Sequence, residues 1–188
     1  MLSIEKLKGG NREAQKELYD THKVAMYKLC RMYIFDKNLA EDLLHDGFIK
    51  VFNHVSKYDQ SKGNIVAWMR KVFTNTCLMH LRKNKLIYNE LEINNAISSL
   101  SESIDPEELN LLSMDQIFKL LHLLPEGYKA VFILFFVEGF THGEISKLLD
   151  ISENTSKSQL LKAKKKMREL IVTNFPNNYN KRTMQLQS

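Results

Sequence analysis

The chain shows helical hydrophobic periodicity in two blocks, within which apolar side chains recur three or four positions apart. In the first block this spacing predicts helices over about residues 12–35, 39–58 and 65–85. In the second block it predicts helices between about residues 114 and 170. The first block lacks the alternation of apolar and polar residues that is typical of a half-buried strand. The pattern therefore predicts an all-α protein made of two small helical domains.

The most apolar stretch of the second block, YKAVFILFFV at residues 128–137, is compatible with a strand or a helix. Its aromatic and β-branched residues favour a strand. The preceding Pro125-Glu126-Gly127 sequence is typical of a helix start, and segments with helical spacing flank the stretch. We therefore expect a buried helix that begins after Pro125 and ends at Gly139.

Residues 140–170 are patterned as a short helix, a tight turn and a second helix that ends in a basic run. The apolar positions expected to hold this unit together are Ile145, Leu148, Leu149, Ile151, Leu160, Ala163 and Met167. This is the pattern of a helix-turn-helix, whose second helix enters the major groove of DNA. The other side of that second helix is polar and cationic, with Asn154, Lys157, Ser158, Leu161, Lys162 and Lys165.

The helix expected at 39–58 has two distinct sides. One side is apolar and consists of Ala40, Leu44, Phe48, Val51 and Val55. The far side consists of Asp42, Asp46, Ile49 and Asn53. A branched apolar residue among carboxylates favours a contact surface for a basic partner. The alternative, a single surface isoleucine without a partner, is common in soluble proteins and stays open here.

The helix expected at 65–85 combines an apolar side with a basic side. We expect the apolar side to contain Ile65, Trp68, Met69, Val72, Phe73, Thr76 and Met79. The basic side contains Lys71, Asn75, Leu78, Arg82 and Lys85. Cations suit a phosphate backbone, and asparagine is able to hydrogen-bond a base edge. Trp68 suits stacking on an unpaired base, but its place in the apolar stripe favours a core position.

The charge distribution divides the chain in the same way. The net charge of +5 is the outcome of +6 over residues 1–90, −6 over residues 91–115 and +5 over residues 116–188. Residues 91–115 contain no Lys or Arg and are rich in Ser and Asn. Two basic blocks joined by an acidic strip indicate two anion-binding modules and a linker. Charge runs that are merely solvated surface remain the alternative.

Other chemistry finds little support in the sequence. No glycine-rich phosphate loop, nucleophile elbow or paired metal motif is present. Cys77 and His80 have the spacing of half a zinc site, but no second pair accompanies them. Cys30 and Cys77 are expected to be reduced core residues. The chain begins without an apolar signal segment, and its longest apolar run, Val131–Val137, is too short to span a bilayer. We therefore expect a cytoplasmic protein that neither inserts into a membrane nor needs a cofactor or metal.

Taken in chain order, these pieces resemble an extracytoplasmic-function (ECF) sigma factor, the small two-domain class of bacterial transcription initiation factor. LKGGNREAQKELYDTH is similar to the opening helix of the family. LAEDLLHDGFIKVFNHVSKYD is similar to its core-polymerase-binding region, and NIVAWMRKVFTNTCLMHLRK to its promoter-melting and −10-reading region. LPEGYKAVFILFFVEGFTHGEISKLLDISENTSKSQLLKAKKKMREL is similar to its fourth region, which reads the −35 element.

The resemblance implies a role for each polar face. The residues that would bind core RNA polymerase are Asp42, Asp46, Ile49 and Asn53. Those that would hold the non-template −10 strand are Lys62, Asn64, Lys71, Asn75 and Arg82. Those that would reach the −35 element are Asn154, Thr155, Lys157, Ser158, Gln159, Lys162 and Lys165. The loop at 58–64 would form the pocket for a flipped base.

The resemblance also implies an organisation and a set of partners. It predicts a region-2-like domain at 1–88, an acidic linker at 89–113, a region-4-like domain at 114–174 and a disordered tail at 175–188. The implied partners are core RNA polymerase, promoter DNA and a cognate anti-sigma factor. The implied function is promoter-specific initiation by binding and without catalysis.

Four positions depart from the family pattern. Asp150 stands where a glycine is common, and Asp tolerates the left-handed backbone of such a turn. Ser156 and Gln159 replace a frequent Val and Arg, which makes them candidates for an individual base preference. Met79 stands where the −10 helix commonly has an Asp.

The main alternative is a helix-turn-helix transcriptional regulator that is not a sigma factor. A regulator of the two-component or quorum type would need a receiver or ligand-binding α/β domain ahead of the helix-turn-helix, but residues 1–90 show no alternating strand pattern. An anti-sigma or scaffold role fits the basic groove-facing side of the second helix poorly.

Overall fold

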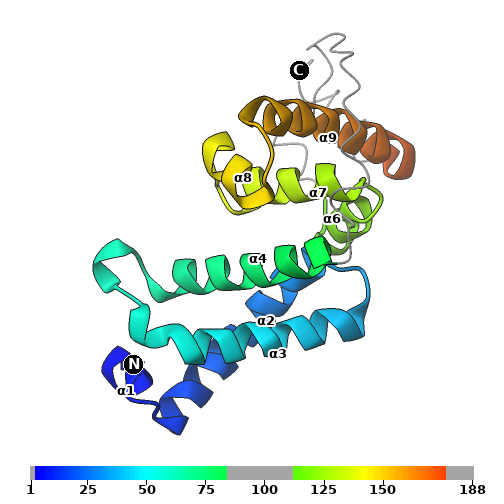
Figure 1. The fold of residues 1–188 in the computed structure, drawn as a ribbon. Helices are drawn as coiled ribbons and strands as arrows, with labels where there is room; N and C mark the ends of the chain where they lie inside the picture. Colours follow the sequence, from blue (N-terminus) through cyan, green and yellow to red (C-terminus); the bar gives the residue numbers. More distant parts are fainter. Residues whose placement is uncertain (1–2, 84–111, 177–188) are drawn as a thin grey trace, which may run out of the picture. The chain divides into compact units, whose positions relative to one another are not determined.

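The computed structural model describes residues 3–83 and 112–176, which divide into two compact units between Lys83 and Asn84 (Figure 1). Each unit is considered by itself. Throughout these two ranges the regular structure is helical and no strand occurs, so the predicted all-α fold is confirmed. No helix in these ranges is long and apolar enough to cross a membrane. Almost all of the predicted acidic linker and tail lies outside the described residues.

The described part of the N-terminal unit contains four α-helices. Their bounds are α1 Ile4–Lys8, α2 Arg12–Tyr33, α3 Lys37–His54 and α4 Ile65–Lys83. The helices α2, α3 and α4 contact one another in all three pairings, and α1 packs on α2. In Figure 1 the three long helices lie side by side as a bundle.

Side-chain caps fix where the long helices of this unit begin. The Asn11 Oδ1 accepts from the Ala14 backbone N–H at 3.0 Å, and the Asp36 Oδ1 accepts from the Leu39 N–H at 2.8 Å. Such caps satisfy backbone donors that have no partner within the helix. Both capping positions agree with the predicted breaks around residues 11 and 36.

Aromatic side chains form the centre of this unit. The Phe48 ring on α3 lies 4.7 Å from the Tyr19 ring on α2 and 5.2 Å from the Phe73 ring on α4, measured between centroids. A Cβ at Gly47 would overlap the Phe73 ring. The missing side chain at Gly47 therefore lets α4 approach α3 closely. Cys30 and Cys77 are buried in the same core, as predicted, and the described residues contain no disulfide.

Two single-turn 3-10 helices, η1 Val55–Lys57 and η2 Gln60–Lys62, connect α3 to α4. The Tyr58 side chain is buried between them, and its hydroxyl donates to the Gly63 carbonyl at 2.9 Å. Asn64 then caps α4, because its Oδ1 accepts from the Ala67 N–H at 2.8 Å. The loop predicted at 58–64 is thus tied down at both ends.

The described part of the C-terminal unit contains four α-helices and a π-helical turn. Their bounds are α6 Met114–Leu121, α7 Glu126–Phe132, η5 Ile133–Val137, α8 His142–Leu149 and α9 Glu153–Asn174. Residues 128–137 are helical, so the predicted helix is confirmed and the strand alternative is wrong. The helix α9 contacts α6, α7 and α8.

The turn between α8 and α9 has the conformation that the sequence predicted. Asp150 ends α8 with φ 57° and ψ 49°, a left-handed conformation. Among the described residues other than glycine it alone has a positive φ. A side-chain carboxylate makes this conformation more accessible to Asp than to most residues. Leu149 and Ile145 are buried beside the turn, whereas Leu148 and Ile151 are only half-buried.

Candidate nucleic-acid and protein interfaces

The helix-turn-helix presents one side of α9 to solvent. Its N-terminus is capped by Ser152, whose Oγ accepts from the Thr155 N–H at 2.9 Å. Beyond this cap Asn154, Lys157 and Lys165 are exposed. Ser158 and Lys162 are half-buried. These residues and half-buried Thr155 form a continuous polar side, as predicted, and cations on it suit a phosphate backbone.

Gln159 corrects the sequence-based prediction for this side. Its side chain is only 5% exposed and lies over Gly127 of α7, where a Cβ would be 3.5 Å from the Gln159 Oε1. A side chain held there does not reach a base edge in the major groove. Its position in the interior is possible because Gly127 has no side chain in the way.

Ser156, the second position expected to tune base preference, is also buried. Its hydroxyl lies 2.9 Å from the His142 Nδ1 and so joins the start of α8 to α9. The His142 ring also stacks on Phe135, at 4.9 Å between centroids. Ser156 therefore links α8 to α9, and its hydroxyl faces the interior of the helix pair.

The environment of His142 disfavours a charged imidazole. Burial lowers the pKa of His142 below its ordinary value, and the nearby Lys157 cation lowers it further. Glu153 acts in the opposite direction with a smaller effect. The neutral ring is therefore favoured where α8 packs on α9.

An ion pair with a buried lysine lies on α7. The Lys129 side chain on α7 is 2% exposed, and its Nζ lies 2.6 Å from the Glu126 Oε1. Burying this lysine is tolerable because the carboxylate of the preceding turn compensates its charge. The helix α7, which carries this pair, packs against α9.

The solvent-exposed line of α4 differs by one residue from the line that the sequence predicts. Leu78, expected on the basic side, is 1% exposed and belongs to the core. Met79, expected in the core, is 60% exposed. Lys71 and Asn75 are exposed as expected, and Arg82 is half-buried. We call the resulting set the α4 stripe and define it as Ala67, Lys71, Asn75, Met79 and Lys83, all exposed and four residues apart.

The charge of α4 is entirely positive. Between Ile65 and Lys83 the helix contains four Lys and Arg residues and no Asp or Glu. The predicted loop residues Lys62 and Asn64, immediately before the helix, are exposed as well. A carboxylate lies next to Lys62, since the Asp59 Oδ2 is 3.7 Å from its Nζ. Hydrogen bonds from Ser61 lower the pKa of Asp59 and keep it ionised.

Trp68 lies where α4 meets this loop. Its ring centroid is 5.7 Å from that of Tyr58. The side chain is half-buried, so the predicted core position holds for only part of the ring. The packing against buried Tyr58 links the loop conformation to the first turn of α4.

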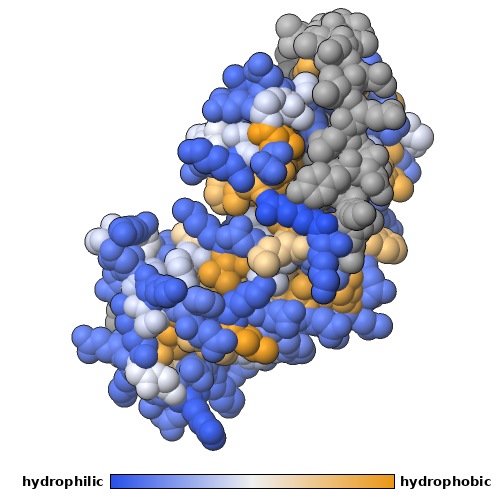
Figure 2. Space-filling view, viewed as in Figure 1, coloured by the Kyte–Doolittle hydropathy of each residue, from blue (hydrophilic) through white to orange (hydrophobic). Residues whose placement is uncertain are grey.

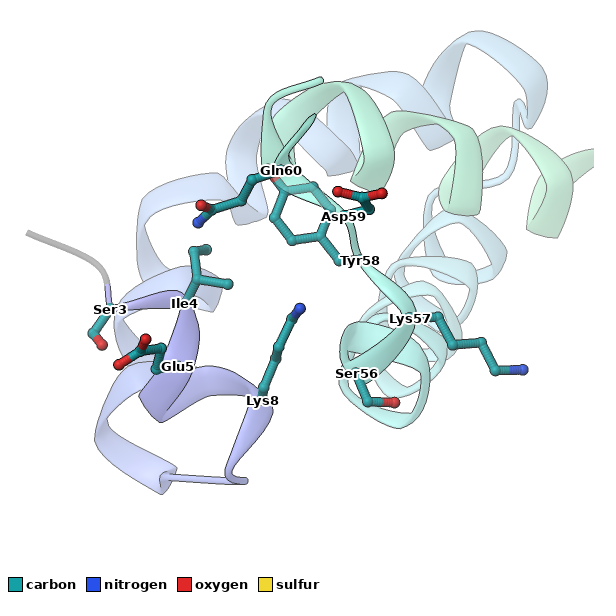
Figure 3. Close-up of a pocket in the computed structure, with 9 residues that line it drawn as sticks. All are labelled: Ser3, Ile4, Glu5, Lys8, Ser56, Lys57, Tyr58, Asp59 and Gln60. Atoms are coloured by element: carbon teal, nitrogen blue, oxygen red, sulfur yellow. The ribbon is translucent and has the colours of Figure 1, made fainter. Parts of the chain in front are cut away.

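A hollow on the other side of the loop lies between α1 and the η1–η2 segment (Figure 3). It is lined by Ser3, Ile4, Glu5, Lys8, Ser56, Lys57, Tyr58, Asp59 and Gln60. In Figure 3 the Lys8 side chain extends into the space between the two segments, whereas that of Lys57 points away. The hollow is largely polar and includes neither Lys62 nor Asn64. Sequence reasoning did not identify the contribution of α1, because a five-residue helix has little periodicity.

The far side of α3 is exposed as the sequence predicts. Asp42, Asp46 and Asn53 are accessible, and the Ile49 side chain between them is 56% exposed. The predicted apolar side of the same helix is buried throughout. The N-terminal unit therefore has an acidic face with an apolar centre on α3 and a basic face on α4. In Figure 2 polar residues dominate the visible surface, and apolar residues form only small patches.

The described residues contain no group of three or more His, Cys, Asp and Glu side chains arranged to hold a metal ion. Cys77 is buried in the core of the N-terminal unit. His80, three residues later, is half-buried.

Two family models match the chain, one in each unit. Residues 18–87 match Sigma-70 region 2, and residues 114–167 match Sigma-70, region 4. Among curated proteins, the ECF RNA polymerase sigma factor SigM of Bacillus subtilis is 28% identical over 160 residues, which cover 82% of this chain and 93% of SigM. SigW of the same organism is 23% identical over 175 residues, covering 88% of this chain and 93% of SigW.

Solved structures show the same fold. The sigma factor RpoE in a complex with the anti-sigma factor NepR from Bartonella quintana aligns with a TM-score of 0.54 and 20% identity, covering 83% of this chain and 95% of that one. CnrH in a complex with the cytosolic domain of CnrY aligns with a TM-score of 0.53 and 17% identity, covering 90% and 95%.

Proposed function

The chain belongs to the sigma-70 family and is an RNA polymerase sigma factor of the ECF type, and we propose that it directs promoter-specific initiation through separate contacts with core polymerase, the −10 strand and the −35 element. The family is not a family of enzymes, and we propose a binding role without catalysis. Because polymerase and chromosome share one compartment in bacteria, we propose that the protein acts in the cytoplasm.

One observation favours this function over an ordinary helix-turn-helix regulator. The N-terminal unit has two exposed faces of opposite charge, acidic on α3 and basic on α4, while α9 provides a further basic side in the other unit. A regulator that only binds an operator needs one DNA-reading surface. An acidic face with an exposed apolar centre suits a protein partner, since carboxylates steer a basic surface and Ile49 contributes buried area.

We propose that Asp42, Asp46, Ile49 and Asn53 bind core RNA polymerase. All four side chains are exposed on the same side of α3. Because Ile49 is 56% exposed, its removal from water on binding would contribute about 1–2 kcal/mol before the costs of association. The two aspartates would add orientation and rate of encounter more than affinity.

We propose that Lys62, Asn64, Lys71, Asn75 and Arg82 hold the melted −10 strand. Lys71 and Arg82 on α4 suit the phosphates, and Asn75 between them suits a base edge. The loop at 58–64 would hold a flipped base, since its backbone is fixed by the Tyr58 hydroxyl and the Asn64 cap. The cost of unstacking one base is a few kcal/mol, which a preorganised pocket offsets.

We propose that Asn154, Thr155, Lys157, Ser158, Lys162 and Lys165 contact the −35 element. Gln159 is left out because its side chain is buried. Each domain alone would bind DNA weakly, because it makes few phosphate contacts. Attachment to the same polymerase would raise the effective concentration of each domain at its element.

The proposed domains are residues 1–88, which would bind polymerase and the −10 strand, and 114–174, which would read the −35 element. An acidic linker at 89–113 joins them in this proposal, and a tail follows at 175–188. We further propose a cognate anti-sigma factor as a partner, since the related RpoE and CnrH chains were solved with such a factor or with the cytosolic domain of CnrY.

Run-off transcription with purified core polymerase tests the proposal. Core polymerase with the full chain should initiate at a defined start site on genomic fragments, whereas core alone should not. Asp46→Arg combined with Ile49→Glu should weaken association with core by about a hundredfold or more, because the first change places a cation against a basic partner and the second removes the apolar contact of Ile49. Pull-down of core by the tagged full chain measures this.

The matched control is Lys28→Glu, a charge reversal at an exposed position of α2 in the same unit. This variant should bind core as the wild type does. Undiminished capture of core by the α3 double variant would contradict the proposed polymerase contact. A chain that binds DNA without making core polymerase promoter-specific would instead support the regulator alternative.

A further inference from the structure

Met79 is an apolar side chain in the middle of a basic, polar line. In the α4 stripe it follows Lys71 and Asn75 and precedes Lys83, and all four are exposed. Residues four apart on a helix lie above one another, about 6 Å apart along its axis. A strand that runs along the stripe from Lys71 to Lys83 would therefore pass over Met79.

The core of the N-terminal unit does not use Met79. Leu78 and Leu81, on either side of it in the sequence, are buried, and Met79 itself is 60% exposed. Its thioether carries no charge and is a poor hydrogen-bond partner for a phosphate. The side chain can therefore only contribute to binding through apolar contact, with a base or with a sugar.

We propose that Met79 contacts the C5-methyl group of a thymine in the captured −10 strand and so makes this helix prefer thymine at one position. The inference rests on the proposed function of α4 in holding that strand. Thymine is the base that offers an apolar group at its edge, and apolar side chains recognise it through that methyl group. The unbranched, flexible methionine side chain can adjust to the base edge.

The methyl group itself is the variable to test. A −10 element is first selected from a randomised library by polymerase that contains the wild-type full chain. Each thymine of its non-template strand is then replaced, one at a time, by deoxyuridine, which lacks only the methyl group. At one position this replacement should weaken open-complex formation by about fourfold, the contribution of one buried methyl group.

Met79→Ala should remove this sensitivity, so that the thymine and deoxyuridine templates bind its holoenzyme equally. Lys71→Ala is the control on the same stripe. It should weaken binding to both templates by the same factor and keep their fourfold ratio, because a phosphate contact is independent of the base.

Three results would overturn the inference. They are an absence of any thymine-to-deoxyuridine effect with the wild type, an unchanged ratio with Met79→Ala, and a loss of core association by Met79→Ala. The last would mean that Met79 contacts protein. Failure of the proposed function is distinguishable, because wild-type holoenzyme would then select no −10 element at all.

Discussion

The helices α4 and α9 are the two most basic helices in the described parts of the chain, and each departs from a simple division into an apolar and a polar side, in opposite ways. The helix α4 exposes an apolar residue, Met79, within its polar line. The helix α9 buries a polar residue, Gln159, within its apolar side. In α4 three packed helices leave one narrow line exposed, whereas in α9 the neighbouring Gly127 makes space for an amide. The edge of a binding face is thus set by the neighbouring helices, and residue type alone is an unreliable guide there.

The largest predicted effect is a difference in stability between two variants that each place a lysine on α4, at adjacent positions. Leu78→Lys should destabilise the N-terminal unit by about 3–5 kcal/mol, because it buries an unpaired charge. Met79→Lys should change stability by no more than about 0.5 kcal/mol, as for other exposed positions. Urea unfolding followed by the fluorescence of Trp68 measures both, since the chain has a single tryptophan and it lies in this unit.

Equal destabilisation by the two lysine variants would contradict the assignment of Leu78 to the core and Met79 to the surface. Met79→Lys also has an expected effect on DNA binding. It adds a cation to the α4 stripe and should therefore steepen the dependence of −10 strand binding on salt.

A smaller effect, on −35-dependent transcription, is expected from a substitution on α9. Lys162→Ala should weaken −35-dependent transcription and reduce the slope of log affinity against log salt by about 1, as for one lost phosphate contact. Gln159→Met, a substitution of similar volume, should leave base preference unchanged and alter stability by no more than about 1 kcal/mol. Run-off transcription on a panel of −35 variants compares the two. A changed base preference in Gln159→Met would restore this residue to the reading face.

The smallest effect is a pH dependence of the C-terminal unit. Because burial and Lys157 lower the pKa of folded His142, the folded unit resists its protonation more than the unfolded chain does. The stabilisation is therefore present above the ordinary histidine pKa and is lost as the pH falls through the lowered value. His142→Asn should reduce this loss, as measured by circular dichroism during thermal unfolding between pH 7.5 and 5. An identical pH profile in the variant would contradict the role of His142.

Much of the fold could be predicted because local chemistry determined it. The caps Asn11 and Asp36 and the left-handed turn at Asp150 follow from single side chains and adjacent backbone. The capping box of Ser113 and Gln116 is equally local, and α6 begins at Met114, where the sequence predicts the first helix of the second block. The π-helical turn at Ile133–Val137 has no comparable signal in the sequence.

The candidate sites could be predicted in outline, but residues at the border between the exposed and the buried side of a helix were assigned less well. The exposure of Asp46 and Ile49 follows from a wide acidic sector opposite a fully apolar one. Leu78 and Met79 are adjacent and 100° apart at the border of two sectors, so a small error in helix phase exchanges them. Gln159 was placed wrongly because its burial depends on Gly127, which is thirty-two residues away in the sequence.

The close contact of Gly47 with Phe73 has a further consequence for initiation. It brings α4 close to α3, and these two helices carry the proposed polymerase and strand contacts. Close packing of this kind would hold the two proposed contacts at a fixed separation. It would fix how many nucleotides separate the captured strand from the first transcribed base, whatever the length of the segment that leads to the second domain. A larger residue at Gly47 would thus be expected to shift the start site as well as to destabilise the bundle.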